Sequence, residues 1–299
     1  LGEGFTAGEA STPFSLAPGE SFPLDITFSP IAELMYGGEV WAESNTPGTT
    51  TRATVTGTSL QQPMAVCEAS PSEIYALYDR AVWVGSNSYD PSGQDIVNWE
   101  WSLTSRPAGS AATMPSGTAD RSGFVADVVG EYVAQLVVRN EDGVESAPCY
   151  ATLNAIPSQS LWVEMYWDTE QDDMDLHMLN NGGSLRGDGD CYYANCVGRG
   201  LDWGDAGVTD DNPSLDIDDI PGTGPENINV QEPEEDAIYR VYVHDYQGST
   251  PDYYGDNTVT VNIYIAGVLE WTGSRVIAGD DDYVPFAVID WASRSVSSL

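Results

Sequence analysis

Short stretches in which apolar and polar residues alternate run along the whole chain, and Gly, Pro, Asn or Asp separates them. A period of two predicts β-strands with one buried face, whereas the helical spacing of three to four residues is nearly absent. Many short strands between turn residues predict an all-β protein made of β-sandwiches. The clearest of these stretches are residues 23–30, 38–44, 51–59, 81–86, 131–140, 161–168, 239–246, 258–267 and 286–293.

Two proline-containing segments interrupt the pattern, SLQQPMAV at 59–66 and NAIPSQS at 154–160. Segments of this kind are typical of the connections between domains. We therefore expect three tandem Ig-like β-sandwich modules at residues 1–60, 61–157 and 158–299.

Composition limits the kinds of protein that this chain can be. It is 41% hydrophobic and 10% aromatic, which is far too apolar for an unfolded polyanion. It has no apolar run near the ~20 residues that a membrane span needs, so we expect no membrane insertion. The net charge of −37 argues against nucleic acid and anionic lipid surfaces as partners. The opening LGEGFTAGEA lacks a signal-peptide pattern and predicts a processed terminus or a fragment.

The four cysteines predict two disulfide bonds. Cys67 and Cys149 lie near the two ends of the second module and would close it, and Cys191 and Cys196 would close the small loop CYYANC. Their spacing matches neither a zinc site nor a redox CxxC motif. Oxidised pairs favour an extracellular location.

The first module has a Pro-Gly turn and a strand ending in F-x-P within residues 14–30, and SN-x-P and a terminal VTGT within residues 37–58. With these features it resembles the later strands of ASH-type (abnormal spindle–Hydin) Ig-like domains of bacterial surface proteins. The strands that open such a sandwich are missing, and about 60 residues with an open sheet edge are marginally stable alone. Upstream sequence, or another chain that adds a strand to residues 1–60, would complete it.

Residues 86–112, SNSYDPSGQDIVNWEWSLTSRPAGSAA, place a Ser-x-Asp-Pro-x-Gly turn before a strand that carries Trp99 and Trp101. The strand GEYVAQLVV follows at 130–138, where Tyr132 and every second residue after it should face a core. The second module thereby resembles a PKD (polycystic kidney disease) domain. The resemblance implies a spacer or adhesive module and no catalyst.

The third module carries WDTEQDDMDLHM at 167–178, LDIDDIPGTGPENI at 215–228 and YRVYVHDY at 239–246. These motifs resemble the YfaP-type domain of secreted bacterial proteins, with its Asp-x-Asp-Leu-His followed by Leu-Asp-x-Asp-Asp and Gly-Pro-Glu. The biochemical activity of that family is poorly defined. The resemblance therefore implies a secreted β-sandwich, and the function has to come from the residues.

The third module holds 28 of the 47 acidic residues, concentrated at 168–175, 188–190 and 216–226. Crowded carboxylates must be protonated, separated or neutralised by a cation, and hard oxygen ligands in tight turns suit Ca²⁺. The alternative is a solvated acidic surface, and the flanking turns favour calcium. The predicted ligands are Asp173, Asp175, Asp188, Asp190, Asp216, Asp218, Asp219 and Glu226.

Strand alternation places some of these ligands together. In MDLHM, the core should take Leu176 and Met178, which leaves Asp175 and His177 on the other face. In SLDIDDI, Asp216 and Asp218 should likewise face away from the core. The residues Gly222, Gly224 and Pro225 then predict a turn that brings Glu226 back toward the cluster.

His177 and His244 are the two histidines of the chain, and each has an aspartate nearby in the sequence. Together they would suit Zn²⁺, but a hydrogen-bonded structural role is favoured for each because they lie far apart in the sequence. The loop CYYANC either fixes the acids at 188 and 190 or displays Tyr192 and Tyr193 to a sugar.

The sequence contains no G-x-S-x-G, H-E-x-x-H or Cys–His pattern, so we expect no enzyme. We predict an extracellular structural or adhesive protein of a bacterial cell surface, stabilised by Ca²⁺. Its partners would be other surface proteins or copies of itself in a filament. The alternative is a carbohydrate-binding accessory region of a larger secreted enzyme, with glycans as ligands.

Overall fold

The computed structural model describes most of the chain, and nearly all of its regular structure is β-strand. Among the described residues there is one helix, the four-residue α1 (Tyr193–Cys196). The predicted all-β class is therefore confirmed. The described residues are 3–8, 15–30, 35–43, 45, 50–59, 61–115, 117–170, 172–198, 200–220, 222–247, 255–278 and 281–299.

Packing of the Cα trace divides the chain into two compact units. One contains Leu1–Ala65, Ser88–Val97 and Val138–Ala147, and the other contains Val66–Asn87, Asn98–Val137 and Pro148–Leu299. Every sheet takes its strands from within one of the three predicted modules. The module boundaries themselves stay a prediction.

Residues 5–58 form two separate two-stranded antiparallel sheets. One sheet pairs β1 (Phe5–Ala7) with β2 (Ile26–Phe28), and the other pairs β3 (Met35–Glu43) with β4 (Thr50–Thr58). The rings of Phe5, Phe28 and Tyr36 pack together, whereas the Trp41 side chain is 59% exposed. Two-stranded sheets of this size are only marginally stable in water by themselves.

Residues 68–156 form a three-stranded sheet, β5-β7-β9, and a four-stranded sheet, β6-β11-β10-β8. The strands are β5 (Glu68–Ser70), β6 (Glu73–Tyr75), β7 (Ala81–Val84), β8 (Ile96–Ser105), β9 (Arg121–Phe124), β10 (Gly130–Asn140) and β11 (Cys149–Ile156). Along β10, the predicted core residues Tyr132, Ala134, Leu136 and Val138 are all fully buried. The predicted disulfide Cys67–Cys149 joins the segment just before β5 to the start of β11, and so links the two sheets.

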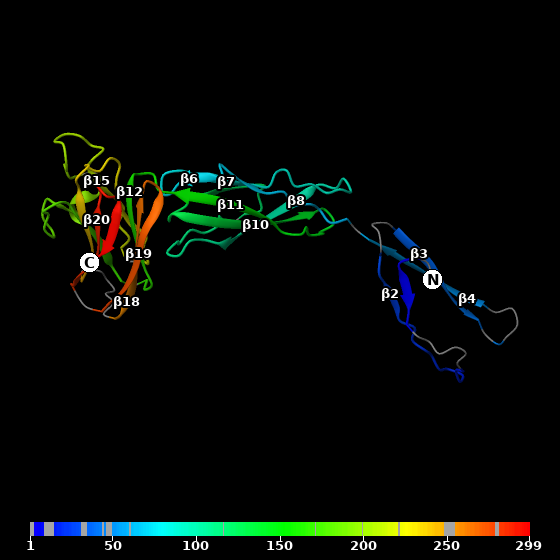
Figure 1. The fold of residues 1–299 in the computed structure, drawn as a ribbon. Coiled ribbons are helices and arrows are strands. Elements are labelled where there is room, and N and C mark those ends of the chain that lie inside the picture. Colours follow the sequence, from blue (N-terminus) through cyan, green and yellow to red (C-terminus); the bar gives the residue numbers. More distant parts are fainter. Residues whose placement is uncertain are drawn as a thin grey trace. The chain divides into compact units, whose positions relative to one another are not determined.

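Residues 161–298 form two five-stranded sheets, β15-β16-β12-β18-β19 and β14-β13-β17-β20-β21 (Figure 1). Apolar residues of both sheets, among them Trp167, Leu176, Val243 and Phe286, make one continuous core between them. The strands are β12 (Leu161–Trp167), β13 (Met174–Leu179), β14 (Asp190–Cys191), β15 (Pro213–Ile217), β16 (Glu226–Val230), β17 (Ile238–Asp245), β18 (Asn257–Ile265), β19 (Val268–Ile277), β20 (Tyr283–Asp290) and β21 (Ser295–Ser298).

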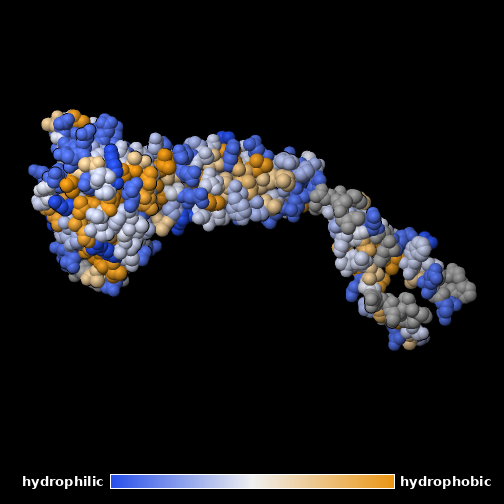
Figure 2. All heavy atoms as spheres, viewed as in Figure 1, coloured by the Kyte–Doolittle hydropathy of each residue, from blue (hydrophilic) through white to orange (hydrophobic). Residues whose placement is uncertain are grey.

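The surface of this C-terminal sandwich mixes polar and apolar side chains, as Figure 2 shows for one face. Edge strand β19 exposes Val268, Leu269 and Val276. In the part of the chain that the structure describes, no helix has the length and apolar character needed to cross a membrane.

Candidate metal centre

The face of β13 and β17 that points away from the core carries three buried polar side chains. Leu176 lies in the core, so its neighbours Asp175 and His177 point to the opposite side of β13, as their alternation predicts. The antiparallel register places His244 of β17 directly across from Asp175. All three are at most 2% exposed because aromatic rings cover this face of the sheet.

Three carboxylates meet beside this row. Asp175, Asp218 and Glu226 each offer an oxygen, and these oxygens all lie within 4.8 Å of one another. Asp175 belongs to β13 of one sheet, and Glu226 begins β16 of the other, so the cluster lies where the two sheets approach each other. The Glu226 carboxylate accepts the backbone N–H of Leu176 at 2.8 Å, which fixes it against β13.

The turn between β15 and β16 brings Asp218 and Glu226 together, as the Gly- and Pro-rich sequence predicts. Gly224 has a φ of +80°, a conformation that costs a glycine little. Its N–H donates to the Asp219 carboxylate at 2.8 Å, and the N–H of Asp219 donates to Glu226 at 3.4 Å. Asp219 thus holds the turn in shape, while Asp218 and Glu226 face Asp175.

The cluster crowds three acids together, and the basic side chain beside it is His244, whose Nδ1 lies 3.2 Å from Asp175 Oδ2. Burial, and then the charge of Asp175, raise the pKa of Glu226 well above its usual range. The pKa of Asp218 is raised by the same two causes in the same order. Such a cluster takes up a proton or a cation, and a cation bound there would relieve the repulsion among all three groups.

Asp216 goes to a different place from Asp218, although simple alternation puts both on one face. A register shift between Leu215 and Ile217 breaks the alternation in β15. The Asp216 carboxylate instead accepts hydrogen bonds from Tyr78 Oη at 2.6 Å and Asn229 Nδ2 at 2.6 Å. These donors, together with Asn227 Nδ2 at 3.1 Å, satisfy it without a metal.

The remaining predicted ligands also lie outside the three-carboxylate group. Asp188 is exposed, and its backbone carbonyl accepts the indole N–H of Trp203 at 3.2 Å. Asp173 is buried immediately before β13, where its backbone carbonyl accepts the N–H of Tyr246 at 2.9 Å. Asp190 is buried and faces His177.

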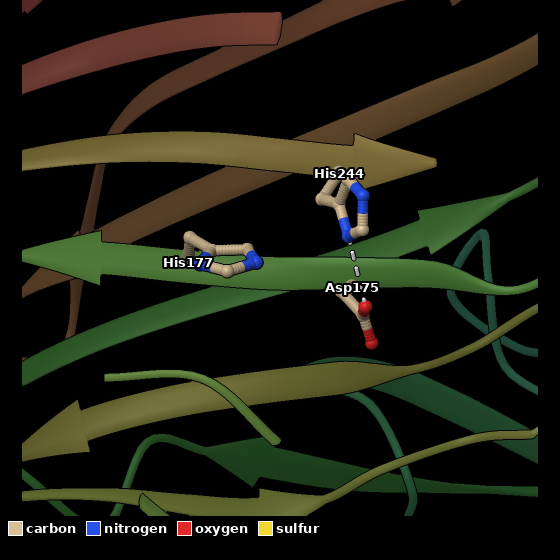
Figure 3. A group of neighbouring side chains, drawn as sticks. All are labelled: Asp175, His177 and His244. Carbon is tan, nitrogen blue, oxygen red and sulfur yellow. Dashed lines mark hydrogen bonds and ion pairs between the residues drawn. The ribbon is translucent and has the colours of Figure 1, made fainter. Parts of the chain in front are cut away.

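The two histidines lie side by side, which their distance in the sequence gave no reason to expect. Their ring centroids are 5.8 Å apart, and Asp175 lies within reach of both (Figure 3). His177 Nδ1 is 2.7 Å from Asp190 Oδ2, and His244 Nδ1 is 3.2 Å from Asp175 Oδ2. The pairing of β13 with β17 creates this juxtaposition.

Sequence reasoning missed two residues of this centre. Asp281 lies 2.8 Å from His244 Nε2, and the ring of Tyr283 stacks on His244 with centroids 4.1 Å apart. Tyr283 lies in β20 directly opposite His244 in the ladder, a register that the sequence does not show. No local motif marks Asp281, which sits in the loop just before that strand.

Comparison with known proteins finds distant structural similarity only. No protein-family model and no curated protein sequence matches the chain. Among solved structures, it resembles the PKD domain from KIAA 1837 protein at 23% identity and a TM-score of 0.26, covering 33% of this chain and 89% of that one. The Yersinia pseudotuberculosis adhesin InvE matches at 12% identity and a TM-score of 0.22, covering 71% of this chain and 58% of the adhesin. The endo-fucoidan hydrolase MfFcnA4 from glycoside hydrolase family 107 matches at 12% identity and a TM-score of 0.22. This match covers 94% of this chain and 39% of the hydrolase.

The chain thus spans less than two thirds of the adhesin and of the hydrolase. All three TM-scores are low, so the function is argued from the site itself.

Proposed function

We propose that this chain belongs to an extracellular, non-catalytic structural or adhesive protein whose C-terminal, YfaP-type sandwich is stabilised by bound Ca²⁺. A PKD-like module, closed by the Cys67–Cys149 disulfide, would act as the spacer that presents it. The observation that carries the proposal is the convergence of Asp175, Asp218 and Glu226.

The chemistry of the three-carboxylate group favours calcium over magnesium. Ca²⁺ accepts six to eight oxygen ligands in flexible geometry, whereas Mg²⁺ requires near-ideal octahedral geometry and gives up its water reluctantly. Asp218 is only partly buried, so the ion has access from solvent and water can complete its shell. Because Asp175 and Glu226 come from different sheets, one ion would tie the two sheets together.

Removing calcium is therefore expected to lower the melting temperature of the C-terminal sandwich. At calcium concentrations 100 to 1,000 times Kd, the bound ion would add about 3–4 kcal/mol to the free energy of unfolding. Differential scanning calorimetry with EGTA, then with excess Ca²⁺ or Mg²⁺, measures this. We expect Ca²⁺ to restore the melting temperature and Mg²⁺ to leave it low.

Two matched variants locate the effect. Asp218→Asn should abolish the response to Ca²⁺, since the Asp218 carboxylate belongs to the three-carboxylate group. Asp188→Asn makes the same change of charge at an exposed position outside that group and should respond like the unmodified protein. Identical melting curves in EGTA and in Ca²⁺ would refute the proposal.

We further propose that strands from another copy of the chain add to residues 5–58. In the described part of this segment each of the four strands has a single neighbour, which leaves an edge of each sheet open for pairing. Sedimentation velocity over a wide range of protein concentration is expected to show self-association. A monomer at every concentration would contradict self-assembly.

A further inference from the structure

The buried row formed by Asp175, His177 and His244 has the donor set of a transition-metal site. Each residue offers one ligand atom, and these atoms all lie within 4.8 Å of one another. Two of the three come from β13 and one from β17, both inside the same sheet, so rigid strands position them (Figure 3). Imidazole nitrogens suit zinc and its neighbours in the periodic table, whereas Ca²⁺ takes oxygen ligands.

His177 has the hydrogen-bonding arrangement of a metal-binding histidine, with one ring nitrogen held by a carboxylate. Asp190 Oδ2 accepts the backbone N–H of Arg186 at 2.7 Å, so this oxygen is an acceptor. His177 Nδ1, at 2.7 Å from the same oxygen, must then carry the proton. Its Nε2 is left as an acceptor in a side chain that is 0% exposed, and no described residue forms a hydrogen bond to it. A buried acceptor without a partner is unfavourable.

His244 has a carboxylate at each ring nitrogen. Nδ1 lies 3.2 Å from Asp175 Oδ2, and Nε2 lies 2.8 Å from Asp281 Oδ1. Two ligands held at about 2.1 Å by a tetrahedral ion lie about 3.4 Å apart, so the first of these distances suits two ligands of one ion. The second carboxylate would then hold the other ring nitrogen, as Asp190 does for His177. Metal-binding histidines usually have such an outer carboxylate.

Aromatic rings hold both imidazoles in place. Tyr192 stacks on His177 with centroids 4.9 Å apart and the planes 10° from parallel, and Tyr283 stacks on His244 at 4.1 Å and 8°. The Cys191–Cys196 disulfide closes the loop that begins with Tyr192. The rings exclude water from the ligand atoms and restrict their rotation, which preorganises the site.

We propose that Asp175, His177 and His244 form a binding site for a divalent transition-metal ion, with Zn²⁺ the best match. His177 Nε2, His244 Nδ1 and the Asp175 carboxylate would be the protein ligands, and water would fill a fourth position. Asp190 and Asp281 would be positioning residues that hold the imidazoles from outside.

Zinc titration of the full chain, stripped of metal, tests the proposal. Isothermal titration calorimetry is expected to show one tightly bound Zn²⁺ per chain, and Co²⁺ in its place should give the intense visible absorption of a tetrahedral site. His177→Gln should abolish both. Asp190→Asn should weaken zinc binding by about 10- to 100-fold while leaving the metal-free melting temperature nearly unchanged. Asp188→Asn, two residues away and exposed, is the matched control and should bind like the unmodified protein.

Failure to bind zinc, or unchanged binding by both His177→Gln and Asp190→Asn, would overturn the site. If His177→Gln does not fold, the zinc affinity of Asp190→Asn alone tests the proposal. The Asp190 carboxylate contacts the His177 ring and would not contact the ion. An Asp190→Asn variant that binds zinc normally but melts lower would show a structural role only.

The zinc site does not depend on the calcium site, although Asp175 belongs to both groups. Asp218→Asn should lose the calcium response and keep zinc binding. His177→Gln should lose zinc binding and keep the calcium response. EGTA also removes zinc, so the calcium test is decided by restoration with Ca²⁺ in zinc-free buffer. The calcium proposal and the zinc proposal can therefore each be refuted without the other.

Discussion

Replacing Cys67 and Cys149 together by alanine is expected to lower the free energy of unfolding of the β5–β11 sandwich by about 4.5 kcal/mol. The disulfide links residues 82 apart in the sequence, so its loss lets the unfolded chain explore many more conformations. Both cysteines are only half-buried, so alanine leaves little cavity and the loss comes mainly from the unfolded state. Urea unfolding followed by tryptophan fluorescence measures the difference.

The second disulfide provides the comparison. Cys191 and Cys196 are only five residues apart, so the same entropy argument gives about 2 kcal/mol for Cys191→Ala/Cys196→Ala. The larger loss should appear in the first double variant. Equal losses, or a larger loss from the short loop, would show that local packing and not chain entropy sets the contribution of these bonds.

Raising the pH is expected to destabilise the protein through Glu164, by about 3 kcal/mol in all. This side chain in β12 is 1% exposed, and burial raises its pKa to about 7 from the ordinary value of 4.5. Between these two pH values the folded state holds a proton that the unfolded state has released. Stability therefore falls as the pH rises from about 4.5 to 7 and is constant beyond.

Glu164→Gln isolates this contribution from the many other acids of the chain. Its carboxylate accepts the N–H of Val129 at 3.0 Å and the amide of Asn262 at 3.4 Å, and a glutamine can keep the first bond through its oxygen. The unfolding free energy of the variant minus that of the unmodified protein should rise by about 3 kcal/mol between pH 4 and 8.

The exposed Glu131→Gln on β10 makes the same change of side chain outside the core and is the matched control. A difference for Glu164→Gln that does not change with pH would mean that burial does not raise the pKa of Glu164.

Local sequence patterns predicted much of the fold. Alternation alone identified many of the strands, among them β4, β10, β12, β17 and β18, and the buried face of β10. A strand turns successive side chains to opposite faces whatever it pairs with. The same rule placed Asp175 and His177 on one side of β13. Cysteine positions predicted both disulfides, since each pair lies at the ends of a segment that folds back on itself.

The candidate metal sites depend more on long-range pairing. Asp216 and Asp218 have the same local pattern, but an irregularity in the β15–β16 ladder sends them to different partners. Glu226 was expected near the cluster from its turn, yet its contact with Leu176 requires the two sheets to meet at that edge.

The sequence by itself determined an acidic all-β chain with two disulfides and with an aspartate and a histidine on one face of β13. Only the tertiary structure decided that His244 lies opposite Asp175, that Asp190 and Asp281 hold the two imidazoles, and that Asp218 and Glu226 share one cluster. The reason is physical. The direction of a side chain follows from the local backbone, whereas its neighbours across a sheet follow from the register between distant strands, which the packing of the whole core sets.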